Sequence, residues 1–92
     1  MMEEVRIQTD DLMEVTRTVA KLAHGRIADG RLDLNVLLDQ ANDNMEMAFV
    51  AYGDGNMAFA AASAAQAASC ALLVAVTLRR VSKDIPPVQE MN

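Results

Sequence analysis

Three acidic side chains at helical spacing form the most regular candidate site in the sequence. Asp39, Asp43 and Glu46 stand at positions i, i+4 and i+7, which places their carboxylates on one face of a helix. Such a stripe can bind a cation, dock a basic partner, or be an ordinary solvated helix face. Di-metal helical bundles use carboxylates from several helices together with Glu-x-x-His pairs, and the sequence has no such pair. We expect a solvated face without metal or other cofactor, and hypothesise that it steers a basic partner.

The residues that could support catalysis are isolated from one another. His24 is the only histidine, and no Cys or Asp constellation accompanies it. Cys70 is the only cysteine and lies in an apolar run, which is typical of an inert buried thiol because a reactive thiol needs exposure and a nearby base. The Gly-rich segment 53–56 follows a predicted helix and lacks the Lys of a phosphate-binding loop, so it reads as a turn. We expect no enzyme activity.

The basic residues are few, and only three of the eight are grouped at the end of one predicted helix. Arg79, Arg80 and Lys83, with Arg26 and Arg31, would make only a modest basic patch. The net charge of −5 opposes binding to a phosphate backbone. The first two predicted helices have the order of a helix-turn-helix, but the second carries four acidic residues and no Lys or Arg. Nucleic acid is therefore an unlikely partner.

The element around which the chain is organised is the apolar run 57–78. It contains no charged residue, Gly or Pro, and nine of the fifteen residues in 57–71 are alanine, the best helix former. These features predict a helix over 57–83, which Pro86 cannot continue. A helix that is apolar on nearly all sides must be buried in protein or in lipid.

Two shorter helices are predicted before this run. The first spans 10–24, between the N-capping residue types at 9–11 and a stop at Gly25. The second spans 33–52 and is capped by Asp33 or Asn35. Its apolar residues follow a 4-3-4-3-4 spacing that is typical of a packing seam: Leu34, Leu38, Ala41, Met45, Ala48 and Tyr52.

The fold class follows from the connections. Four residues join the second and third helices, so an antiparallel hairpin is expected. We predict one all-α domain over 1–92, with an N-terminal arm at 1–9, three helices built on the long hairpin, and a tail at 84–92. The alternating residues of the arm fit a short strand or a frayed helix entry equally well.

The chain carries more apolar surface than three helices of these lengths can cover. It is 52% hydrophobic but only 3% aromatic, and the predicted first helix is too short to cover both long helices. Homo-oligomerisation, most simply a two-fold dimer, would assemble the hairpins into a helical bundle. The alanine spacing predicts the oligomer interface at five positions: Ala61, Ala64, Ala65, Ala68 and Leu72.

A membrane span over 57–78 is the main alternative way to bury this surface. The length is sufficient, and basic residues follow the run as they do on a cytoplasmic flank. Alanine contributes little to insertion, however, and Gln66 with two serines and a threonine opposes it. We therefore favour the soluble oligomer.

The functional hypothesis is a small, acidic, cytoplasmic adaptor or inhibitor of a larger protein. Residues 1–56 hold eleven acidic against five basic residues, the chain begins without a signal peptide, and the single cysteine suits a reducing compartment. The predicted partner-binding residues combine the acidic stripe with bulky side chains near the hairpin tip: Asp39, Asp43, Glu46, Met45, Met47, Phe49, Tyr52, Met57 and Phe59. A small-ligand pocket between subunits is a further alternative, with four candidate polar contacts: Asn44, Tyr52, Ser63 and Gln66.

Overall fold

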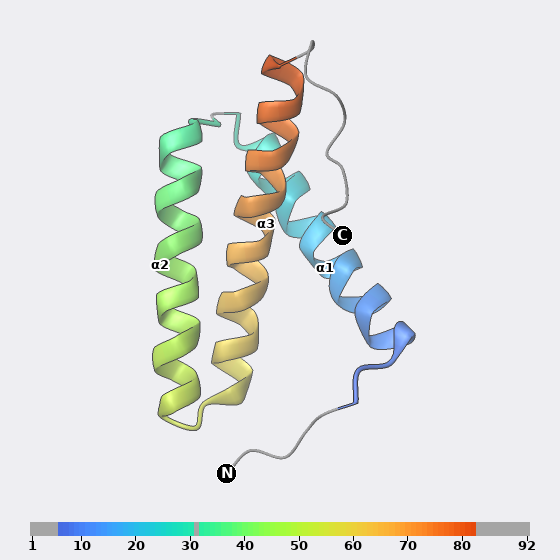
Figure 1. Cartoon of the computed structure of the whole chain (residues 1–92), viewed down its shortest axis with the longest axis vertical. Coiled ribbons are helices and arrows are strands. Elements are labelled where there is room, and N and C mark those ends of the chain that lie inside the picture. Colours follow the sequence, from blue (N-terminus) through green and yellow to red (C-terminus); the bar gives the residue numbers. More distant parts are fainter. Residues whose placement is uncertain (1–5, 31, 83–92) are drawn as a thin grey trace.

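The protein folds as three α-helices in the computed structural model, which describes residues 6–30 and 32–82 (Figure 1). The helices are α1 (Thr9–Ala28), α2 (Leu34–Gly53) and α3 (Met57–Val81), and the described ranges contain no strand. α2 and α3 lie side by side as an antiparallel hairpin, and the C-terminal half of α1 crosses α3 on one face of it (Figure 1). The predicted all-α fold and its hairpin are confirmed.

α1 extends beyond the predicted bounds of 10–24. The expected stop at Gly25 is wrong, because the helix continues to Ala28. Arg26, the next residue, is held by hydrogen bonds to both other helices, and this tertiary anchoring outweighs the poor helix propensity of one glycine. The glycine that leaves the helix is Gly30, whose φ of 91° lies in the left-handed region.

The hairpin helices begin at side-chain caps. Asp33 Oδ1 accepts a hydrogen bond from the Asn35 amide at 2.8 Å, so α2 starts and ends one residue later than predicted. Gly55 takes a left-handed φ of 81° in the connecting turn. Asn56 Oδ1 then accepts from the Phe59 amide at 3.1 Å and caps α3. The interpretation of the Gly-rich segment as a turn is confirmed.

α3 ends two residues before the predicted end of 57–83. Ser82 is its C-cap and leaves helical geometry with φ −107° and ψ 64°. Serine competes for backbone hydrogen bonds and favours helix ends over interiors. Residues 1–5 of the predicted arm at 1–9 and the whole predicted tail at 84–92 lie outside the described residues.

The face that α2 packs against α3 agrees only in part with the predicted seam, of which Ala48 is buried and Leu34 and Ala41 are half-buried. Leu37, Ala48 and Ala51 are buried on α2, and Ser63 and Ala67 are buried on α3, which packs along α2. Small side chains on both helices let the two backbones approach closely. Three larger residues of the predicted seam are instead 43–54% exposed: Leu38, Met45 and Tyr52.

α3 buries polar residues together with Ala67 and Leu73, and leaves much of its remaining apolar surface exposed. Ser63, Ser69 and Cys70 are buried, and Gln66 and Thr77 are half-buried. Only 28% of the apolar stretch of α3 is buried. A surface helix usually packs a purely apolar stripe against the core, so the buried serines of α3 are unusual.

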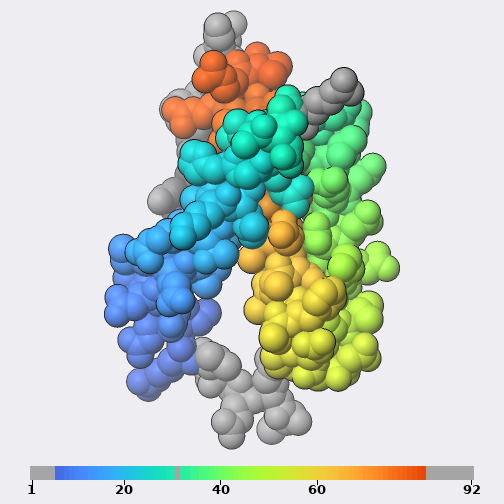
Figure 2. Space-filling view, turned by 180° about the vertical axis from the view of Figure 1, so that it is seen from behind, coloured from blue at the N-terminus to red at the C-terminus, as the bar shows by residue number. Residues whose placement is uncertain are grey.

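The buried apolar core is correspondingly small. Seven of the described residues are apolar and buried, and four of these form one cluster: Ala23, Leu37, Cys70 and Leu73. The N-terminal half of α1 leaves the hairpin, as Figure 2 shows from behind, so Leu12 and Val15 are more than half exposed. Burial of a single leucine contributes only about 2 kcal/mol, so two buried leucines are a small core for three helices.

Candidate functional site

An open groove of about 340 Å³ lies at the tip of the hairpin, between the C-terminal half of α2 and the start of α3. We call it the tip groove. Its lining combines three carboxylates with apolar side chains: Asp43, Glu46, Met47, Val50, Ala51, Asp54, Asn56 and Phe59. An acidic and apolar lining suits a ligand that is itself both cationic and apolar.

Helical spacing and one cap position these side chains. Asp43, Met47, Val50 and Asp54 stand at i, i+4, i+7 and i+11, which places them on one stripe of α2. The Asn56 cap fixes the start of α3, so that Phe59 reaches the same groove from the second helix. Val50 and Phe59 are 54% and 47% exposed, so much of the apolar lining is open to solvent.

The carboxylates of the tip groove have no basic counterpart in the part of the chain that the structure describes. Asp43, Glu46 and Asp54 form no ion pair or side-chain hydrogen bond within residues 6–30 and 32–82. α2 contains no Lys or Arg, and the first basic residue of α3 is Arg79, at its far end. The groove is therefore a region of uncompensated negative charge.

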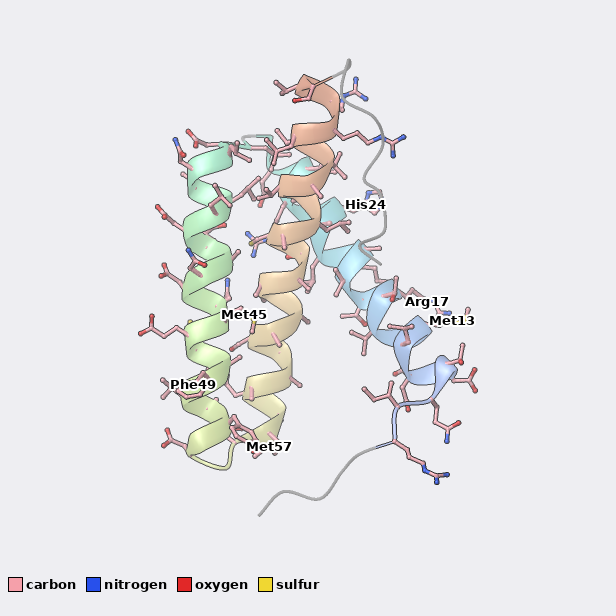
Figure 3. All side chains as sticks on the ribbon, viewed as in Figure 1. Met13, Arg17, His24, Met45, Phe49 and Met57 are labelled. Carbon is pink, nitrogen blue, oxygen red and sulfur yellow. The ribbon has the colours of Figure 1, made fainter. Side chains whose placement is uncertain are left out.

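The predicted partner-binding residues fall into several places. Four line the tip groove: Asp43, Glu46, Met47 and Phe59. The other five do not line it: Asp39, Met45, Phe49, Tyr52 and Met57. Figure 3 shows Met45, Phe49 and Met57 at separate places around the hairpin, and Phe49 is 77% exposed. The groove also contains Val50 and Asp54, which the sequence reasoning missed, although both continue the i, i+4, i+7 spacing from Asp43.

A second surface covers the side of the hairpin that is turned away from α1. Leu38, Met45 and Tyr52 recur every seven residues on α2, opposite Gln40, which faces α1 through Arg26. Figure 1 looks onto this side, with α1 passing behind α3. On α3 it contains four residues of the predicted oligomer interface, of which Ala61 and Ala68 are exposed and Ala64 and Ala65 half-buried. The fifth predicted residue, Leu72, is exposed but lines a pocket against α1. We call the other seven residues of this surface the open hairpin face; none of them is charged.

A polar cluster inside the bundle joins all three helices. The guanidinium of Arg26 donates from Nη1 to Gln40 Oε1 at 2.8 Å, from Nη2 to Gln66 Oε1 at 2.8 Å, and from Nε to Ser69 Oγ at 3.1 Å. Ser69 Oγ in turn donates to the Gln66 carbonyl at 2.7 Å. We call these four residues the Arg26 cluster. Its acceptors are all uncharged, so the cluster positions α1 on the hairpin through hydrogen bonds instead of an ion pair.

The sequence did not predict this cluster. Arg26 was assigned to a surface basic patch, which is wrong, because its side chain is half-buried between the helices. Arg79 and Arg80 are exposed at the end of α3, and Arg31 and Lys83 lie outside the described residues. The available signal was the polar line of α3, whose Gln and Ser residues are costly to bury without partners.

The remaining candidates for chemistry stay apart from one another. Cys70 is fully buried with its Sγ 3.9 Å from Gln40 Oε1, and His24 is exposed on α1 (Figure 3). Among the described residues, no group of three or more His, Cys, Asp or Glu side chains is placed to hold a metal ion. The carboxylates of the tip groove are thus spread along it and do not converge on one point.

The four residues considered for a small-ligand pocket also diverge. Ser63 is buried, Gln66 belongs to the Arg26 cluster, and Asn44 Nδ2 donates to the Gln40 carbonyl at 2.9 Å. Tyr52 lies on the open hairpin face. None of the four lines the tip groove.

Comparison with known proteins found no match to a family model, to a curated protein or to a solved structure.

Proposed function

We propose that the protein is a small, non-catalytic, homo-oligomeric binding module of the cytoplasm, an adaptor or inhibitor that binds a larger protein. The observation that carries the proposal is the open hairpin face, an uncharged surface that includes three large exposed side chains of α2: Leu38, Met45 and Tyr52. A contiguous apolar surface of this kind marks an interface.

The size of the open hairpin face suits a second copy. α2 has 20 residues, which gives about 30 Å of length at 1.5 Å per residue, and two packed helices are roughly 20 Å wide. The face thus covers about 600 Å² per copy, and a two-fold pair would bury about 1,200 Å², the lower end of the range for specific interfaces. Two hairpins paired in this way form a four-helix core.

A single-pass membrane protein is the second candidate, and one observation favours it. Within the described residues, α3 is the one helix long and apolar enough to cross a bilayer, and it buries polar side chains while exposing apolar ones. Helices packed in a bilayer share this pattern. α2 lies along α3, however, so inserting the hairpin would bring Asp39, Asp43 and Glu46 toward the lipid at a cost of several kcal/mol. The soluble oligomer is therefore preferred.

Light scattering on a detergent-free gel-filtration peak separates these candidates. The proposal predicts a soluble protein whose molar mass is a discrete multiple of 10.0 kDa, with a dimer as the simplest case. Recovery only in detergent would support the membrane span instead. A monomer at concentrations of about 100 µM would contradict both, because an interface of standard size should associate well below that concentration.

A further inference from the structure

The tip groove continues the surface of the hairpin on which α1 packs. Gln40 faces α1 through its hydrogen bond to Arg26, and Asp43 and Met47 follow it at i+3 and i+7 on the same stripe of α2. Only the C-terminal half of α1 lies on the hairpin, and its N-terminal half stands away from it (Figure 2). Near the hairpin tip, this surface thus offers a groove in which a third helix could pack, and α1 does not occupy it.

The groove has the dimensions of a short helical contact. Asp43 and Asp54 are eleven residues apart on α2, so the stripe between them is about 16 Å long, or three helical turns. Met47, Val50 and Phe59 provide apolar contact for a bulky side chain near its middle. Amphipathic helices are recognised in grooves of this type through apolar anchors that recur every three to four residues.

The negative charge of the groove favours a bound helix that carries basic residues beside its apolar anchor. Asp43, Glu46 and Asp54 have no basic counterpart among the described residues, and they do not converge on a metal position. Separated carboxylates are matched best by separated cations, as on a helix that carries Lys or Arg one turn to either side of its apolar anchor. Each such contact would compensate a carboxylate that now faces only solvent.

We infer that the tip groove binds an amphipathic helical segment of a basic protein, with a bulky apolar side chain on Met47, Val50 and Phe59 and Lys or Arg residues at the three carboxylates. This inference deepens the proposed function, because it names the site and the chemical class of the partner that the module binds. The bound segment would extend the three-helix packing from the Arg26 cluster to the hairpin tip.

A synthetic peptide tests the inference on the full chain. The probe is a fluorescein-labelled helix of about 15 residues, with Leu every three or four positions and Lys beside them, and fluorescence anisotropy gives its Kd. Neutralising the groove with Asp43→Asn, Glu46→Gln and Asp54→Asn should weaken binding about tenfold or more. The matched control removes three exposed carboxylates of α1 and its C-cap with Asp10→Asn, Glu14→Gln and Asp29→Asn, and should change Kd less than about twofold.

The apolar part of the site has its own controls. Val50→Ser should weaken binding of the Leu/Lys peptide about fivefold or more. In an NMR titration with the peptide, the amide signals of residues 43–54 and of Phe59 should shift more than those of residues 34–38. Equal losses in the two neutralised variants would overturn the inference, because they would show attraction to net charge alone. Binding of spermine, or of a peptide with Lys but no Leu, as tight as that of the Leu/Lys peptide would also overturn it. So would the absence of peptide binding.

The molar mass of the same samples separates this inference from the proposed function. A monomer that binds the peptide in the tip groove would contradict the homo-oligomer and support the groove. An oligomer that does not bind it would contradict the groove and leave the open hairpin face as the interface.

Discussion

Replacing Arg26 by alanine should lower the free energy of unfolding by about 2–3 kcal/mol and release α1 from the hairpin. The substitution removes three hydrogen bonds from a charged donor, and it leaves Gln40, Gln66 and Ser69 to find other partners inside the bundle. Half-buried polar groups without partners are destabilising. α1 otherwise depends on small contacts around Ala23, so it has little to replace the lost anchor.

Urea denaturation at fixed protein concentration measures this loss, and hydrogen exchange locates it. Amides of α1 should exchange faster in Arg26→Ala, while those of the hairpin keep most of their protection. Arg26→Lys should recover little stability, because one ammonium cannot reproduce the planar fork that reaches three acceptors on two helices. The control is Arg17→Ala, which removes an exposed arginine of the same helix and should cost less than about 0.5 kcal/mol. Equal stability of the Arg26 and Arg17 variants would contradict the anchoring role.

Placing a charge on the open hairpin face should dissociate the oligomer. Ala68→Glu introduces a carboxylate at an exposed position, so a single copy keeps its hairpin. In a two-fold interface the residue occurs twice, and both carboxylates would be desolvated close to one another. A penalty of about 3 kcal/mol or more raises the dissociation constant at least about 100-fold. Sedimentation over a concentration series should therefore show a monomer where the unmodified chain is associated.

The matched control makes the same substitution elsewhere. Ala28→Glu adds a carboxylate at an exposed position at the end of α1, away from the open hairpin face, and should leave the dissociation constant within about threefold. If Ala68→Glu and Ala28→Glu associated equally well, the face formed by α2 and α3 would not be the interface.

Local signals in the sequence were sufficient to predict the hairpin. The run of alanines, the caps at Asp33 and Asn56, and the turn that requires Gly55 each depend on residues next to one another in the chain. The end of α1 could not be predicted in this way. It is fixed by Arg26, whose acceptors are between 14 and 43 residues away.

The packing face of α2 was predicted only in part, because the helix has two overlapping apolar stripes. Leu38 and Met45 lie on one stripe and Leu37 and Ala51 on the other, while Ala41 and Ala48 belong to both. Periodicity alone cannot choose between them, since the choice depends on α3. The small inward side chains of α3 select the stripe with more alanine and leave the larger side chains outside.

Only part of the tip groove was predicted, because periodicity places residues of one helix but does not show how the helices pack. Spacing identified Asp43, Glu46 and Met47, which lie on one helix, and composition identified Phe59. Neither spacing nor composition separated these four residues from Met45, which lies on the other side of α2, because the sequence does not indicate where α3 and α1 pack. Four of the five positions predicted for the oligomer interface lie on the open hairpin face, and their pairing with a second copy stays a prediction.

The most direct test of the proposed assembly is an isotope-filtered NOE measurement on a mixture of labelled and unlabelled chains. We expect intermolecular NOEs between the methyl groups of Met45 and those of Ala64 and Ala68, because a two-fold contact through the open hairpin face places these groups within about 5 Å of one another. The absence of such NOEs in the mixed sample would contradict the two-fold contact through the open hairpin face. The same holds if these methyl groups give cross-peaks only with water or detergent. A second copy would then not cover the open hairpin face.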